Sequence, residues 1–89
     1  MISKTVKIIN KLGLHARPSA RVVQVTSRFK SEIMLEKDGV EVNGKSIMGV
    51  LMLAAGIGSE VKVTTNGEDE EEALEVVSEL LASNFEIEC

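Results

Sequence analysis

The sequence is poor in several residue types on which common functions depend. Histidine, proline and cysteine each occur once, phenylalanine occurs twice, and tryptophan and tyrosine are missing. The single cysteine, Cys89, excludes an intrachain disulfide and a cysteine-based zinc site. No paired acids and no nucleophile–base set occur at usable spacing, so an ordinary hydrolase is not expected. We expect neither a metal ion nor a cofactor.

Long apolar runs and a basic excess are also missing. No run approaches the roughly 20 apolar residues that span a bilayer, and the opening MISKTVKIIN lacks the uninterrupted apolar stretch of a signal peptide. We therefore expect a cytoplasmic protein that does not contact membranes. Ten basic residues stand against 14 acidic ones, for a net charge of −4. This balance disfavours a general nucleic-acid binder.

What the chain does contain is the composition of a globular domain. Hydrophobic residues make up 44% and charged residues 27% of its 89 positions. This length is close to the lower limit at which one core supports itself, and there are no repeats or linkers. We expect a single domain over residues 1–89, and a monomer.

Alternation of apolar and polar residues predicts the strands. The pattern indicates a strand, a hairpin and another strand, over residues 4–9, 31–44 and 59–67. Asp38 and Gly39 provide the hairpin turn. The side chains that share one face within these strands are Ile33 and Leu35, Val40 and Val42, and Val61, Val63 and Thr65.

Helical spacing predicts three helices. The first lies within residues 15–29, because Pro18 suits a first helical turn. Small or apolar residues recur there at helical spacing, at Ala16, Ala20, Val23 and Ser27. The second is short, lies within residues 45–58 and has Ser46 as its N-cap.

The third helix begins in an acidic run, Glu68 to Glu72, which complements the positive end of the helix dipole. We interpret this run as a solvated face without chemistry, and Asn84 as the stop. The apolar stripe consists of Ala73, Val76, Val77, Leu80 and Leu81.

The predicted order is β-α-β-β-α-β-α, which favours a two-layer α+β domain with helices on one face of an antiparallel sheet. The order of the strands within the sheet does not follow from periodicity. The first six elements suit a ferredoxin-like sheet equally well.

The candidate chemical site is His15 at the entrance of the first helix. The helix start offers unpaired N–H groups and the positive end of a dipole, which suit an anion and disfavour a protonated imidazole. Arg17 adds a fork of donors for phosphate oxygens, Pro18 costs no hydrogen bond, and Gly13 permits a sharp turn. These residues could hold a phosphoryl group on one histidine.

Two separated motifs, GLHARPSA at residues 13–20 and VNGKSIMGVLMLAAGIGSEVKV at residues 42–63, resemble the HPr family of the bacterial phosphoenolpyruvate-dependent sugar phosphotransferase system. The resemblance covers essentially the whole chain. It implies an open-faced β-sandwich with strand order 1-4-2-3, and a carrier rather than an enzyme. It also implies that His15 takes phosphate on Nδ1 from enzyme I and passes it to enzyme IIA domains. Arg17 would contact the phosphate, and Pro18 would fix the loop.

The second motif predicts a docking surface and a regulatory serine. The short helix is too apolar for a single buried stripe, so part of it is expected to face partner proteins. The predicted docking residues are Arg21, Lys45, Ile47, Met48, Leu51 and Met52, with core packing as the alternative role of Leu51. Resemblance to members from low-GC Gram-positive bacteria implies that an ATP-dependent HPr kinase/phosphorylase modifies Ser46.

Two alternatives stay open at this point. One is a nitrogen-related phosphorelay carrier of the same family, which EEEALEVV in the last helix favours, whereas GKSIMGV favours sugar transport. A catabolite-repression relative without the histidine is excluded by His15. The other alternative is a ferredoxin-like RNA-binding module, which would need aromatic residues on central strands, whereas Phe29 and Phe85 lie outside the predicted strands.

Overall fold

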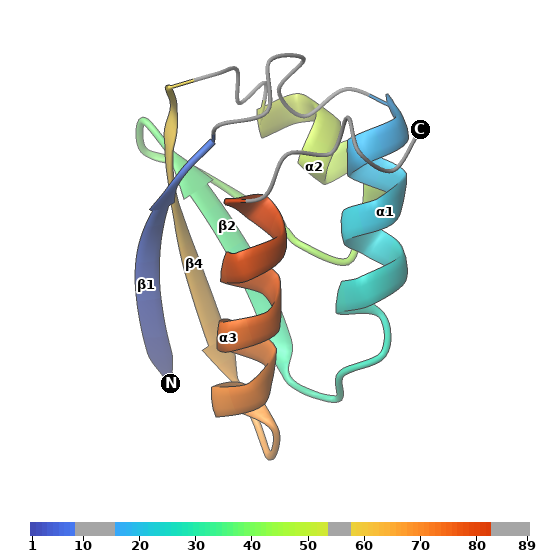
Figure 1. Ribbon diagram of the computed structural model, residues 1–89, viewed down its shortest axis with the longest axis vertical. Helices are drawn as coiled ribbons and strands as arrows, with labels where there is room; N and C mark the ends of the chain where they lie inside the picture. The colour runs from blue at the N-terminus through green and yellow to red at the C-terminus, as the bar shows by residue number, and fades with distance from the viewer. Residues whose placement is uncertain (9–15, 54–57, 83–89) are drawn as a thin grey trace.

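The computed structural model describes residues 1–8, 16–53 and 58–82. Within these ranges, four strands and three helices follow the predicted order (Figure 1). The elements are β1 (Ile2–Lys7), α1 (Ala16–Thr26), β2 (Glu32–Lys37), β3 (Val40–Asn43), α2 (Ile47–Leu53), β4 (Glu60–Asn66) and α3 (Glu70–Leu81).

The strands form one antiparallel sheet in the order β1-β4-β2-β3. The prediction of an open-faced sandwich with order 1-4-2-3 is therefore confirmed. A ferredoxin-like sheet has its first and third strands in the centre, whereas here β4 and β2 are central and β1 and β3 are the edges. The observed order excludes that alternative.

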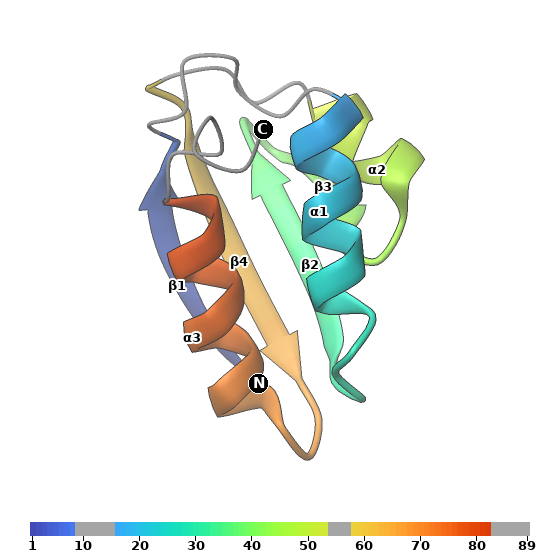
Figure 2. The same ribbon diagram turned by 45° about the vertical axis from the view of Figure 1, so that its right-hand side comes forward.

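All three helices lie on one side of the sheet, and α1 and α3 run side by side in opposite directions across it (Figures 1 and 2). The inward side chains of the strands alternate with solvent-facing ones, as predicted. The fully buried strand residues are Ile33, Leu35, Val61, Val63 and Thr65. In β3 the alternation is weaker, because Val40 is exposed and Val42 is half-buried.

The hairpin turn forms where the sequence places it. Asp38 and Gly39 have φ angles of 52° and 82°. Left-handed backbone at both central positions is typical of a two-residue type I′ hairpin turn, in which aspartate and glycine are favoured. This turn sets β3 against β2, with Lys37 opposite Val40.

The predicted first helix forms as α1, but the residues whose spacing predicted it are not its most buried ones. Ser19, Val22, Val25 and Thr26 are buried, whereas Ala20 and Val23 are half-buried and Ser27 is exposed. Burial of Thr26 is compensated by hydrogen bonds, since its hydroxyl donates to the carbonyl oxygens of Gly44, at 2.9 Å, and Val23, at 3.2 Å. A polar residue therefore occupies a position that an apolar stripe would assign to solvent.

The apolar stripe of α3 is confirmed in outline. Ala73, Val77 and Leu81 are buried, and Val76 and Leu80 are half-buried. The helix ends at Leu81, with Ala82 as its C-cap. Asn84, the predicted stop, lies outside the described residues, as does Ile9, the predicted end of the first strand.

Candidate functional site

The first turn of α1 carries the residues that follow the candidate histidine in sequence. The helix begins at Ala16, so Arg17 and Pro18 are its second and third residues. The first turn contains no acidic residue that would offset the positive end of the dipole. Because a helix leaves its first N–H groups without intrahelical acceptors, proline is tolerated this early. His15 lies outside the described residues.

Ser46 is the N-cap of α2, as the sequence predicts. Its Oγ accepts a hydrogen bond from the N–H of Gly49 at 3.1 Å, three residues into the helix. Its own N–H donates to the carbonyl oxygen of Asn43 at 3.1 Å, and its carbonyl accepts from Val50 at 2.9 Å. The side chain is half-buried. Three hydrogen bonds thus fix the position of Ser46 at the start of α2.

The two faces of α2 differ sharply in burial. Val50 and Leu53 are buried in the core, whereas Met48 and Met52 are 66% and 71% exposed. Ile47 is exposed as well, and Leu51 is half-buried. The expectation that part of this helix faces solvent is therefore met. We refer to Ile47, Met48, Leu51 and Met52 as the α2 patch.

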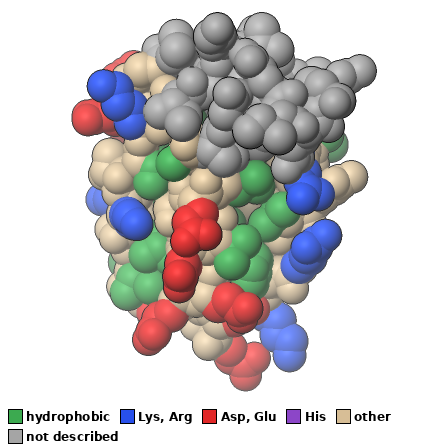
Figure 3. Space-filling model, in the orientation of Figure 1, with side chains coloured by type: hydrophobic (Ala, Val, Ile, Leu, Met, Phe, Trp, Pro, Cys, Tyr) green, Lys and Arg blue, Asp and Glu red, His purple; other side chains and the backbone are tan. Residues whose placement is uncertain are grey.

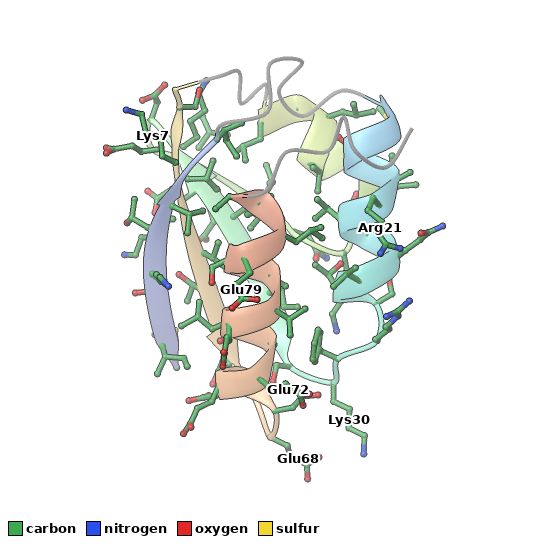
Figure 4. The ribbon with its side chains drawn as sticks, viewed as in Figure 1. Lys7, Arg21, Lys30, Glu68, Glu72 and Glu79 are labelled. Carbon is green, nitrogen blue, oxygen red and sulfur yellow. The ribbon has the colours of Figure 1, made fainter. Side chains whose placement is uncertain are left out.

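The two basic residues predicted beside the α2 patch are both half-buried. Arg21 lies in the middle of α1 (Figure 4). The Lys45 ammonium donates a hydrogen bond to the carbonyl oxygen of Phe29 at 2.7 Å. Lys45 therefore joins the segment before α2 to the segment after α1, a structural role that its sequence position did not signal.

On the face shown in Figure 3, acidic side chains gather over α3, and Lys and Arg side chains lie on both sides of them. Figure 4 places Glu72 and Glu79 on α3, and Glu68 beside Lys30 at the end of the molecule remote from the start of α1. The Glu68 carboxylate and Lys30 ammonium are 3.7 Å apart. The first turn of α1 is thus separated from the acidic run by about the length of the helix layer (Figure 1).

Within the acidic run, Asp69 has a specific role that the sequence analysis missed. Its carboxylate accepts hydrogen bonds from the Ser31 hydroxyl and from the N–H groups of Lys30 and Ser31. Led by the Ser31 hydroxyl, these donors lower the pKa of Asp69 from 3.8 to about 2. The pKa of Glu70 is also lowered, chiefly by the N–H of Gly67 and then by the chain's own N-terminal ammonium. The interpretation of this run as only a solvated face is therefore incomplete.

Across residues 1–8, 16–53 and 58–82, no three His, Cys, Asp or Glu side chains lie close enough together to hold a metal ion. In the same ranges, no helix combines the length and apolar character that crossing a bilayer requires.

Comparison with known proteins relates the chain to one family. A family model described as "PTS HPr component phosphorylation site" matches residues 2–83. The phosphocarrier protein HPr of Treponema pallidum is 50% identical over 88 residues, which cover 99% of this chain and all of that protein. The HPr-like protein Crh of Halalkalibacterium halodurans is 52% identical over 77 residues, 86% of this chain and 92% of that one. The crystal structure of HPr-C-His from Thermoanaerobacter tengcongensis superposes with a TM-score of 0.91 at 48% identity, covering 97% of both chains.

Proposed function

This chain belongs to the HPr family of phosphocarrier proteins, and from that premise we propose that it carries a phosphoryl group on His15 from enzyme I to enzyme IIA domains in the cytoplasm. The observation that carries the proposal is the family match over residues 2–83, which includes the GLHARPSA motif. The start of α1 at Ala16 supports it, because this helix end directly follows the histidine in sequence. Sugar uptake through the phosphotransferase system is the role of such a carrier.

The proposed transfer needs one nucleophile and a means of holding charge. The Nδ1 lone pair of His15 attacks the phosphorus of the phosphohistidine on enzyme I. A new N–P bond forms as the donor N–P bond breaks, and the donor imidazole leaves with the electron pair. The N-terminal N–H groups of α1 and the guanidinium of Arg17 would stabilise the phosphoryl oxygens. Pro18 would hold the backbone of the first turn in place.

The chain on its own has no catalytic cycle under this proposal. A second transfer discharges His15: an enzyme IIA residue attacks the phosphorus, its new bond to phosphorus forms as the N–P bond of His15 breaks, and the His15 imidazole leaves with the electron pair. The α2 patch would bind both partners in turn, because exposed methionines adapt to surfaces of different shape. Arg21 and Lys45 would border this docking surface.

Acceptance of phosphate is tested with enzyme I and labelled phosphoenolpyruvate. The proposal predicts one phosphate that is labile in acid and stable in base, as phosphohistidine is. His15→Ala should take up no label, whereas Ser3→Ala, a change on the exposed side of β1, should take up label like the parent. Failure of the parent to take up label would end the carrier proposal.

Regulation at Ser46 is a second part of the proposal, and its support is the hydroxyl at the N-cap of α2 beside the exposed Met48. An ATP-dependent HPr kinase/phosphorylase would transfer phosphate to this hydroxyl, adding about −1.5 to −2 charges next to the α2 patch. We expect this charge to weaken docking of enzyme I. Ser46→Asp should therefore accept phosphate on His15 more slowly than the parent, and Ser3→Asp should not. Equal rates for Ser46→Asp and the parent would contradict this part.

A further inference from the structure

The methionines of the chain occupy three different environments. Met48 and Met52 lie one helical turn apart on the outer face of α2, 66% and 71% exposed. Met34 is half-buried in β2, which is a central strand. Met1 is 80% exposed, and its N-terminal ammonium lies 3.2 Å from Glu70 at the start of α3. A helix of seven residues thus presents two thioethers to solvent as a pair.

We propose that Met48 and Met52 are a peroxide-sensitive oxidation site, at which conversion to methionine sulfoxide weakens the docking of partner proteins. The site itself follows from exposure and spacing, whereas its effect on docking rests on the function proposed above for the α2 patch. In each step a thioether sulfur attacks one oxygen of hydrogen peroxide. An S–O bond forms, the O–O bond breaks, and water is released, so sulfur loses the two electrons that peroxide gains.

Because of the position of Met48 and Met52, their oxidation should weaken the binding of partner proteins and leave the fold intact. Core packing by α2 uses Val50 and Leu53, whereas Met48 and Met52 point away from the core. A sulfoxide is polar and hydrogen-bonds to water, so a partner that covers it must remove that water. The unoxidised side chains are apolar and adaptable, which suits contact with several proteins. Oxidation of a methionine does not change its charge, whereas phosphorylation of Ser46 adds negative charge.

The selectivity of oxidation is measured first. The folded protein, with Cys89 alkylated so that its thiol does not compete, is treated with a limiting dose of hydrogen peroxide and digested for mass spectrometry. We expect Met48 and Met52 to form sulfoxide several-fold faster than Met34, and all four methionines to react at similar rates after unfolding in urea. Equal rates for Met34 and the α2 pair in the folded protein would overturn the site.

The consequence is measured with a variant that cannot be oxidised there. Met48→Leu/Met52→Leu keeps an apolar α2 patch of similar volume and retains Met1 and Met34 as internal controls. We expect peroxide to lower the affinity of the parent for enzyme I about tenfold, or about 1.4 kcal/mol. The affinity of the double variant for enzyme I, whatever its value before treatment, should not change with peroxide. Treatment of the oxidised parent with methionine sulfoxide reductases should restore its affinity.

Two results would overturn the proposed effect on docking. One is an oxidised parent, with sulfoxide at both positions, that binds enzyme I as tightly as the untreated protein. The other is a double variant that loses affinity as much as the parent. If the untreated protein has no affinity for enzyme I, the docking function proposed for the α2 patch fails and the effect of oxidation on it fails too. The mass spectra still decide the oxidation site independently.

Discussion

Asp69 accepts two hydrogen bonds from Ser31, one from the backbone N–H at 2.9 Å and one from the hydroxyl. The N–H of Lys30 donates to the other carboxylate oxygen at 3.0 Å. Asp69 directly precedes α3, and Lys30 and Ser31 lie between α1 and β2. One carboxylate thus ties the start of α3 to the connection that follows α1.

Asp69→Asn should lower the free energy of unfolding at neutral pH, because an amide has one acceptor oxygen where the carboxylate uses two. The pKa of Asp69 is lower in the folded protein, about 2 against 3.8, so its contribution is complete above pH 3.8 and is lost as the pH falls toward 2. Urea unfolding of parent and variant across this range measures it. The difference between them should be constant above pH 4 and shrink below it; a difference independent of pH would contradict this role.

Gly67 is expected to tolerate substitution far less well than Gly39. A Cβ at Gly67 would lie 2.7 Å from Cα of Ser31, whereas a Cβ at Gly39 meets nothing within 4 Å. Both glycines have positive φ, so both alanine variants carry backbone strain of roughly 1 kcal/mol or more. Gly67→Ala should lose about 2–4 kcal/mol in all, because the segment around Ser31 must also move. Thermal unfolding checks this, and equal losses at the two positions would contradict it.

The ammonium of Lys45 should contribute to folding as well as to any docking. Lys45→Met keeps most of the side-chain length and removes the hydrogen bond to Phe29. We expect a loss of about 1 kcal/mol, typical of a single partly buried hydrogen bond. Lys62→Met is a suitable control, since Lys62 is exposed on β4, and it should cost much less. Urea unfolding measures the free energy of unfolding of both variants. Equal losses in Lys45→Met and Lys62→Met would show that the hydrogen bond from Lys45 does not stabilise the fold.

Paired substitutions distinguish a specific role of the α2 patch in docking from a general effect of surface hydrophobicity. Met48→Glu should lower the affinity for enzyme I roughly tenfold, because docking would then bury a carboxylate. Val40→Glu introduces the same side chain at an exposed apolar position on β3 and should leave the affinity unchanged. Calorimetric titration with enzyme I compares the two. Unchanged affinity in Met48→Glu would remove Met48 from the docking surface.

Local features of this fold could be predicted because short-range chemistry determines them. The Asp38-Gly39 turn needs left-handed backbone that these residues adopt readily, and the Ser46 cap needs a hydroxyl within reach of an N–H three residues later. Both were identified from the sequence. Strand order was not, because alternation identifies the inner face of a strand and leaves its neighbours open. The family resemblance was needed for the order 1-4-2-3.

The errors arose where polar side chains make contacts distant in sequence. The hydroxyl of Thr26 donates a hydrogen bond to the carbonyl oxygen of Gly44, so burial of this polar residue could not be predicted from hydrophobicity alone. Asp69 lies within an acidic run whose side chains are expected to face solvent. Its partner Ser31 is 38 residues away, so their hydrogen bonds could not be predicted from the local sequence. For the candidate site, the sequence placed Arg17 and Pro18 in the first helical turn correctly. The roles of His15 and Arg17 in transfer, and of Ser46 in regulation, remain predictions.

The central claim is that His15 both accepts and releases a phosphoryl group. The most direct measurement loads the protein from labelled phosphoenolpyruvate with enzyme I, removes enzyme I, and then adds an enzyme IIA domain. We predict that acid-labile label leaves this protein and appears on the enzyme IIA domain, and that His15→Ala carries none. Label that stays on the protein, or label that loads equally well on His15→Ala, would contradict the account.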